Sequence, residues 1–220
     1  MLIQGQVGPV TALDSSQATL RQGRTGEVIA SQAHARYYEQ TSRGNFFTLT
    51  LATTSSTVAA GNALNAGAGP AAAGSTQFAL WNPVGSGYNL SLNKFIVAPI
   101  SGTPTAGPIF HTLMIFGNPT ITSAAVIAPA NNLVGGRPPV ARYLTSAAGA
   151  TLTGGTVPVV LRPAAFTYSG AFSAAAGTQA VEFIEGDIVI PPGYGWVPCF
   201  TGVGTTFLNA FSVTWEEVPI

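Results

Sequence analysis

The chain has 220 residues, of which 46% are apolar and only 7% are charged, against a usual ~25%. Its formal net charge at pH 7 is zero, so a free monomer has little electrostatic protection against self-association. This composition excludes global disorder. It indicates a subunit whose surface is covered by other copies or, alternatively, an extracellular monomer with a neutral polar surface.

The few charges are unevenly placed along the chain. Residues 1–43 carry a net charge of +1, residues 44–181 carry +4 with no acid, and residues 182–220 carry −5 with no base. We therefore expect opposite charges to meet within the fold or between neighbouring copies, where they fix register more than affinity. No basic cluster is dense enough to indicate nucleic-acid binding. No apolar run approaches the roughly 18 residues of a membrane span.

The first 45 residues are predicted to form an N-terminal arm. Residues 1–25 are polar and lack a period, which favours an extended chain. In residues 27–43 apolar side chains recur at four-residue spacing, which predicts a short helix, with a strand or an extended crossing as the alternative. Gly44 is expected to end this helix.

From residue 46 onward, short segments rich in β-branched and aromatic residues alternate with Gly, Pro, Asn and Ser, a pattern typical of strands. The expected strands are 46–52, 77–81, 88–98, 109–116, 157–162, 181–184, 187–190, 196–200 and 208–218. They predict one all-β domain over residues 46–220, an antiparallel β-sandwich that is jelly-roll-like and carries the extended arm.

Two stretches, 53–76 and 145–156, consist mainly of Ala, Gly, Ser and Thr. Between strands of one domain they are predicted to be long loops, which usually serve function or pack against a neighbour.

Catalytic candidates are few. His111 lies inside an apolar strand, where a hydrogen-bonded wall residue is more ordinary than a catalytic base. Cys199 is the single cysteine, so no intrachain disulfide can form, and it is interpreted as a small buried hydrophobic residue. A pairing of Cys199 with His111 stays open. Glu216 and Glu217 adjoin on a strand and point to opposite faces, so they cannot act together. We assign no catalytic residue and predict that the protein is not an enzyme.

The spacings typical of zinc sites are absent from the sequence, and we assign no metal site and no cofactor. Glu182, Glu185 and Asp187 are close enough in sequence to offer oxygen ligands to calcium. The plainer interpretation is a solvated turn that joins two strands.

Aromatic residues are candidates for recognition. Tyr194 and Trp196 lie in a predicted loop where flat rings could stack on sugars or on a partner, and Trp81 and Tyr88 flank another. Packing in the core or in a subunit interface is the alternative, because aromatic rings dominate both kinds of burial. The full set of interface or ligand candidates is Arg21, Arg24, Tyr37, Tyr38, Trp81, Tyr88, Tyr194 and Trp196.

Two stretches carry a family resemblance. The segment LWNPVGSGYNLSLNKFIV (80–97) resembles an Asn-Pro-x-Gly-Ser-Gly turn and long strand found in small β-rich proteins encoded by tailed bacteriophages. The segments EGDIVIPPGYGWVPCF and FSVTWEEVPI resemble the closing pattern of those proteins. The resemblance implies a virion structural protein, such as a head-decoration (cement) subunit or a fibre.

Such a protein is expected to form a homo-oligomer, with a trimer favoured, and to contact the major capsid protein or other virion proteins. It is expected to be made in the host cytoplasm without a signal peptide and to reside in the virion. The chain departs from the usual tailed-phage major capsid fold, which contains a long helix, and this favours an accessory part. The alternatives are a single-jelly-roll shell protein and a carbohydrate-binding receptor or fibre module.

Overall fold

The structure is a computed structural model, and the described residues are 36–51, 64–65, 69–70, 78–101, 107–115, 120–122, 129–145, 151–153, 156–167, 179–200 and 208–220. By compactness the chain separates into Met1–Glu39 and Gln40–Ile220. Most of the predicted arm, including Arg21 and Arg24, lies outside the described residues, and its extended form stays a prediction.

Helix α1 (Tyr38–Ser42) lies at the C-terminal end of the segment that was expected to be helical or extended. It ends as the sequence predicts. Gly44 has a φ of +69°, and its N–H donates to the carbonyl of Thr41 at 2.9 Å. Glycine adopts this left-handed conformation without the steric cost that a side chain brings.

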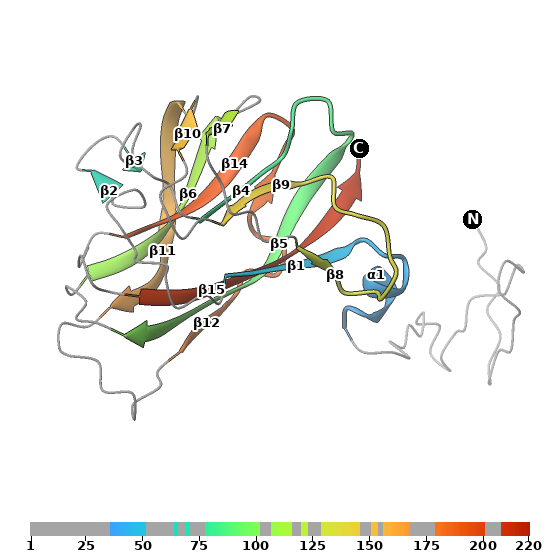
Figure 1. Cartoon of the computed structure of the whole chain (residues 1–220), viewed down its shortest axis with the longest axis horizontal. Helices are drawn as coiled ribbons and strands as arrows, with labels where there is room; N and C mark the ends of the chain where they lie inside the picture. The colour runs from blue at the N-terminus through green and yellow to red at the C-terminus, as the bar shows by residue number, and fades with distance from the viewer. Residues whose placement is uncertain are drawn as a thin grey trace, which may run out of the picture. The chain divides into compact units, whose positions relative to one another are not determined.

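Two antiparallel sheets pack face to face around one hydrophobic core, which confirms the predicted all-β sandwich (Figure 1). The first sheet has the order β12 (Ala180–Phe183), β5 (Tyr88–Ser101), β15 (Leu208–Pro219), β1 (Phe46–Leu51) and β8 (Ala130–Asn131), and β13 (Val189–Ile190) also pairs with β5. The second sheet has the order β11 (Thr156–Thr167), β6 (Gly107–Ile115), β14 (Tyr194–Phe200), β4 (Phe78–Trp81) and β9 (Arg142–Thr145).

The strand pairing is that of a long hairpin rolled up on itself. Strand β1 pairs with β15, β4 with β14, β5 with β12, and β6 with β11. Among these eight long-range partners the first pairs with the last, the second with the seventh, the third with the sixth, and the fourth with the fifth. This order is jelly-roll-like.

The nine expected strands fall on β1, β4, β5, β6, β11, β12, β13, β14 and β15. Strand β13 is shorter than predicted, because Asp187 and Ile188 belong to the turn that precedes it. The sequence missed six short strands. They are β2 (Leu64–Asn65), β3 (Gly69–Pro70), β7 (Thr120–Thr122), β8, β9 and β10 (Thr151–Thr153). Because β2, β3 and β10 lie in the two stretches expected to be loops, that prediction was wrong at these positions.

The core is built from alternating strand positions. On β15, Phe211, Val213 and Trp215 are buried, and Trp215 stacks on Phe47 with ring centroids 5.7 Å apart. In the facing sheet the ring of Trp196 meets Phe95 edge to face at 5.2 Å. Each large side chain buried in this way contributes roughly 1.5–3 kcal/mol relative to exposure.

Strand β5 changes its inward face part of the way along. Leu90 and Leu92 are buried before the change, and Phe95 and Val97 after it. The β5–β15 register shifts at this point, which marks a β-bulge. At the bulge the carbonyl of Asn93 accepts hydrogen bonds from the N–H groups that follow β12, at 2.8 and 3.0 Å. The bulge therefore fixes the turn between β12 and β13.

The Asn-Pro-x-Gly-Ser-Gly segment forms a tight turn between β4 and β5. The buried side chain of Asn82 donates to the carbonyls of Tyr88 and Ile190, at 2.6 and 3.0 Å. The N–H of Ser86 donates to the carbonyl of Pro83 at 3.2 Å. Asn82 thus ties this turn to β13, which explains why an asparagine begins the segment.

Candidate functional site

Two groups of polar side chains occupy the two open sides of the sandwich. The His111 cluster lies where β11 contacts β12 and consists of His111, Arg162, Glu182, Asp187 and Trp196. The Arg137 cluster lies along the connection from β8 to β9 and consists of Asn45, Tyr88, Asn131, Arg137 and Glu217. The His111 cluster joins strands of both sheets, and the Arg137 cluster ties strands of the first sheet to the connection that leads to β9 of the second.

His111 on β6 is fully buried and has a partner at each ring nitrogen. Its Nδ1 lies 2.9 Å from the indole Nε1 of Trp196, and its Nε2 lies 2.7 Å from Oε2 of Glu182. An indole N–H can only donate, so Nδ1 must accept and carries no proton. The neutral ring therefore has its proton on Nε2, which donates to Glu182. This confirms the interpretation of His111 as a hydrogen-bonded wall residue.

Arg162 connects this arrangement across the two sheets. It projects from β11, and its Nε and Nη2 lie 3.2 and 3.1 Å from Oε1 of Glu182 on β12. Its Nη1 donates to Asp187 in the turn that follows. The basic middle of the chain thus meets the acidic end within the fold, which was one of the two arrangements expected from the sequence.

The segment proposed as either a calcium site or a solvated turn is a turn. Asp187 N–H donates to the carbonyl of Ile184 at 3.0 Å, and Glu185 and Gly186 between them have φ values of +55° and +89°. Glu182 and Asp187 are both engaged by Arg162. In the described part of the chain, no group of three or more His, Cys, Asp or Glu residues is placed to hold a metal ion.

Cys199 on β14 is fully buried, as predicted. Burial raises the pKa of its thiol to about 12, so the reactive thiolate is scarce at neutral pH. Its Sγ lies 3.7 Å from the carbonyl of Val197, while both nitrogens of His111 are bonded to Trp196 and Glu182. The Cys199–His111 pairing left open by the sequence is therefore not formed.

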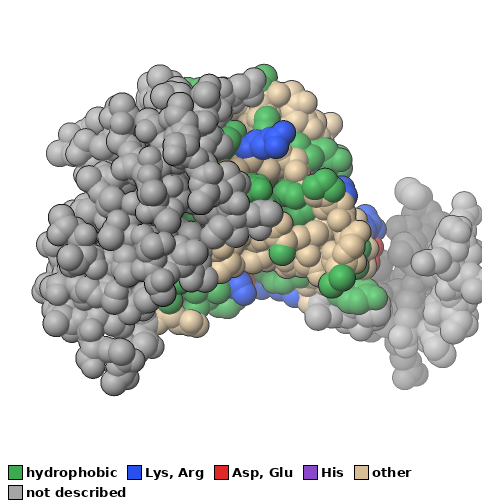
Figure 2. Space-filling model, in the orientation of Figure 1, with side chains coloured by type: hydrophobic (Ala, Val, Ile, Leu, Met, Phe, Trp, Pro, Cys, Tyr) green, Lys and Arg blue, Asp and Glu red, His purple; other side chains and the backbone are tan. Residues whose placement is uncertain are grey.

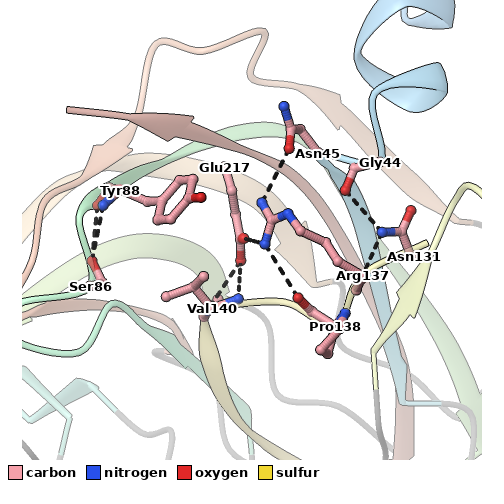
Figure 3. Close-up of polar contacts among 10 residues, drawn as sticks. Gly44, Asn45, Ser86, Tyr88, Asn131, Arg137, Pro138, Val140 and Glu217 are labelled. Carbon is pink, nitrogen blue, oxygen red and sulfur yellow. Dashed lines mark hydrogen bonds and ion pairs between the residues drawn. The ribbon is translucent and has the colours of Figure 1, made fainter.

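The Arg137 cluster is centred on a buried carboxylate (Figure 3). Glu217 on β15 is fully buried, and its Oε1 accepts from the N–H groups of Val140 and Ala141, at 2.7 and 2.9 Å. Its Oε2 lies 2.6 Å from Nη1 of Arg137. The neighbouring Glu216 is partly exposed, which confirms that the two glutamates point to opposite faces.

Aromatic rings and an asparagine hold the guanidinium of Arg137. The guanidinium carbon lies 5.1 Å from the ring centroids of both Phe47 and Tyr88, within the range of a cation–π interaction. Its Nη2 donates to Oδ1 of Asn45 at 3.2 Å. Tyr88, an interface candidate from the sequence, is thus a structural partner of Arg137.

Asn131 fixes the connection that carries Arg137. Its side-chain amide donates to the carbonyls of Gly44 and Arg137, both at 2.9 Å (Figure 3). Its Oδ1 accepts from the N–H of Leu133 at 2.9 Å. Because β8 belongs to the first sheet and β9 to the second, this connection closes one open side of the sandwich.

Sequence reasoning missed the Arg137 cluster, although a signal for Glu217 was available. The same alternation that points Phe211, Val213 and Trp215 into the core continues to Glu217. Buried carboxylates are rare unless they are paired. A glutamate on that face therefore required a cation, and Arg137 supplies it.

The remaining aromatic candidates divide between core and surface. Trp81 and Trp196 are buried, so their rings are packed in the protein and are not available to stack on a sugar. Tyr38 and Tyr194 are exposed. The ring of Tyr37 lies 5.5 Å from the guanidinium carbon of Arg36.

Exposed apolar side chains gather on the strands that flank the His111 cluster. They are Val159, Val160 and Leu161 on β11, Val181 and Phe183 on β12, and Val189 on β13. Phe183 is 64% exposed. In the described part of the face drawn in Figure 2, hydrophobic groups are interspersed with uncharged polar groups and with separate patches of Lys and Arg side chains. The exposed apolar side chains of β11, β12 and β13 offer contact area beside the charges of the His111 cluster.

In comparisons with known proteins, no family model, no curated protein and no solved structure matches the chain. Among the described helical residues, none forms a helix with the length and apolar character needed to cross a membrane.

Proposed function

We propose that the protein is a virion structural protein, a capsid decoration (cement) subunit that stabilises a phage head through contacts with its own copies and with the shell. The proposal begins from the resemblance of residues 80–97 and of the closing strands to small phage proteins. It adds that the chain works as a homo-oligomer, with a trimer favoured, and contacts the major capsid protein.

The observation that carries the proposal is the exposed apolar surface on a nearly uncharged sandwich. Phe183 is 64% exposed on the edge strand β12, Val181 on the same strand is 39% exposed, and Val189 on β13, which also pairs with β5, is 43% exposed. Edge strands of soluble monomers are usually protected by charges, prolines or bulges. Exposed apolar side chains on such an edge favour a surface that other chains cover.

The burial and hydrogen bonding of the Cys199 and His111 side chains also favour a structural role. Burial raises the pKa of the Cys199 thiol to about 12, and both nitrogens of His111 are occupied. Neither group is presented to a substrate, and the described carboxylates of the two clusters are held by arginines.

A single-jelly-roll shell protein is the second candidate, and the pairing order of the strands favours it. Jelly rolls are common in viral capsid proteins, although they also occur in lectin and cupin domains. Fold alone does not assign function, so the two candidates must be separated by assembly behaviour.

Light scattering on the purified protein tests the proposal. A cement subunit is expected to form a small closed oligomer by itself and to bind only to assembled heads. A shell protein is expected to form large closed particles that electron microscopy detects. A monomer that stays monomeric at high concentration and does not bind heads would contradict both.

Two matched variants locate the contact surface. Phe183→Ser is expected to lower the oligomer mass or the affinity for heads, because it removes the largest exposed apolar side chain of β12. Val134→Ser changes a residue that is 98% exposed in the turn after β8 and is expected to leave assembly unchanged. Equal behaviour of the two variants would argue against β12 as a contact strand.

A further inference from the structure

We propose that the His111 cluster is an acid-released latch, which holds the β11–β12 side of the sandwich closed at neutral pH and opens it when His111 takes up a second proton. The inference concerns a conformational property of the fold and does not rest on the proposed role in a virion.

The first step is the fixed tautomer of His111. Its Nε2 proton is committed to Glu182 at 2.7 Å, so the single free position for another proton is Nδ1. That nitrogen accepts the indole N–H of Trp196 at 2.9 Å. A proton on Nδ1 would set two donors against each other in a fully buried site. Protonation and the Trp196 hydrogen bond therefore exclude one another.

The second step concerns the groups that face the imidazole ring of His111, because their charges favour or oppose its protonation. Glu182 from β12 favours protonation through its charge and its hydrogen bond, while Arg162 from β11 opposes it. Asp187 lies beyond Arg162 and is bonded to it. From β14 and β5 the ring meets Trp196 and Phe95, which carry no charge.

Burial is the largest effect at His111 and lowers its pKa below the ordinary value of 6.5. In the unfolded chain the same imidazole takes up its proton near that ordinary value. Between these two pH values the unfolded state binds more protons than the folded state, so stability decreases as the pH falls through this window. Above it, the contribution of the neutral ring is fully present.

The third step is the location of the cluster. Glu182 belongs to the first sheet, whereas His111, Arg162 and Trp196 belong to the second. Strand β12 has four residues and, among the described strands, pairs with β5. Its polar links to the second sheet run through Glu182 to His111 and Arg162. When His111 turns away from Trp196, we expect β12 and β11 to separate first.

The opposite side has a different construction. Among the described residues the Arg137 cluster contains no histidine, and its carboxylate is held by two backbone N–H groups and a guanidinium. Acidification in the range where His111 titrates is therefore expected to leave the β8–β9 side closed. Opening on one side alone distinguishes a latch from ordinary acid unfolding.

The test uses the full wild-type chain labelled with ¹⁵N in its histidine rings. NMR spectra from neutral to acidic pH report the protonation of each ring nitrogen, and His34→Ala assigns the second of the two histidines. We expect His111 to show an unprotonated Nδ1 and a protonated Nε2 at neutral pH, and to gain its second proton below pH 6.5. Hydrogen exchange, corrected for the pH dependence of the intrinsic rate, is measured on the same samples. Protection of β11 and β12 is expected to fall with the His111 titration, while protection persists on the opposite side, in β9 and in β1, which pairs with β8.

Two variants move the transition in opposite directions. Glu182→Gln removes the charge that favours the protonated ring and is expected to shift opening to lower pH. Arg162→Gln removes the charge that opposes it and is expected to shift opening to higher pH. A purely structural ion pair would weaken the fold in both variants without such opposite shifts.

Three results would overturn the latch. One is a His111 ring that is doubly protonated at neutral pH. Another is protonation of His111 with no loss of exchange protection on β11 and β12. The third is simultaneous loss of protection on both sides of the sandwich. The wild-type measurements decide each of these even if a variant does not fold.

Discussion

The two open sides of the sandwich are closed by related means that differ in one component. On the β8–β9 side, Glu217 is fully buried and is held by backbone N–H groups and Arg137. On the β11–β12 side, Glu182 is 19% exposed and is held by Arg162 and by His111. Backbone amides do not titrate in the physiological range, whereas imidazole does. A carboxylate–arginine pair can therefore be made insensitive or sensitive to pH by the third group that contacts the carboxylate.

The largest expected effect on the free energy of unfolding is on the β8–β9 side. Glu217→Ala removes the acceptor of two backbone N–H groups and the carboxylate partner of Arg137, whose guanidinium keeps its hydrogen bond to Asn45. Loss of one partner of a fully buried pair costs about 3–5 kcal/mol, and because the Arg137 side chain is 32% exposed we expect the lower end of this range, about 3 kcal/mol. Glu216→Ala is the control, because Glu216 is partly exposed on the opposite face and should change stability by about 0.5 kcal/mol or less. Urea unfolding at pH 7 measures both. Similar losses for the two variants would show that the Glu217 contacts are not the cause.

A pair of tryptophans isolates the hydrogen bond of the pH-sensitive side. Trp196 donates to His111, whereas the buried indole N–H of Trp215 has no hydrogen-bond partner among the described residues. Trp196→Phe and Trp215→Phe remove similar volumes from the core. We expect Trp196→Phe to cost about 1–3 kcal/mol more at pH 7, because it leaves the buried Nδ1 of His111 unsatisfied. Chemical denaturation of the two variants gives the difference, and a larger loss for Trp215→Phe would contradict the assignment.

A glycine lies in a turn on each side, Gly136 near β8 and Gly186 between β12 and β13, and replacing each of them by alanine should destabilise the fold for a different reason. A Cβ on Gly136 would lie 2.6 Å from the amide of Asn131, so Gly136→Ala should displace that side chain and cost about 1–2 kcal/mol by weakening its three hydrogen bonds. Gly186 has a φ of +89°, and alanine there should cost roughly 1 kcal/mol. Thermal unfolding compares the variants. A neutral Gly136→Ala would show that the Asn131 contacts can rearrange freely.

The smallest expected effect is at the outer end of the His111 cluster. Asp187 is 62% exposed, so its ion pair with Arg162 is screened by solvent. Asp187→Asn should change the free energy of unfolding by about 0–1 kcal/mol, and the difference should shrink at high salt. Denaturation at low and high ionic strength measures both. A large effect that persists in salt would place Asp187 among the groups on which closure depends.

The local alternation of apolar and polar residues was enough to predict the main strands, but it could not predict which strands pair with each other. The alternation of apolar residues identified β1, β5 and β15, because each of them buries one face. The short strands β7 to β10 have two to four residues, too few for a period to appear. Their existence depends on partners supplied by the rolled topology.

The same limit applies to the two clusters. Trp196 and His111 are 85 positions apart in the sequence. Arg162 and Glu182 form a hydrogen bond between the two sheets. No local spacing in the sequence predicts either contact. Local context did identify His111 as a wall residue and the Glu185 region as a turn. For Glu217, alternation along β15 predicts that the side chain lies on the buried face. Its partner Arg137 lies in an irregular segment whose sequence has no period.

The position of β15 has a consequence for how the protein is made. This strand runs between β5 and β1 in the first sheet, yet the ribosome adds it after every other strand of the sandwich. Until it emerges, β1 and β5 have a gap between them, and the nascent chain cannot complete that sheet. Folding that waits for such distant contacts is slow. We therefore expect the first sheet to form only after β15 has emerged from the ribosome, and a truncation that removes β15 to abolish the fold.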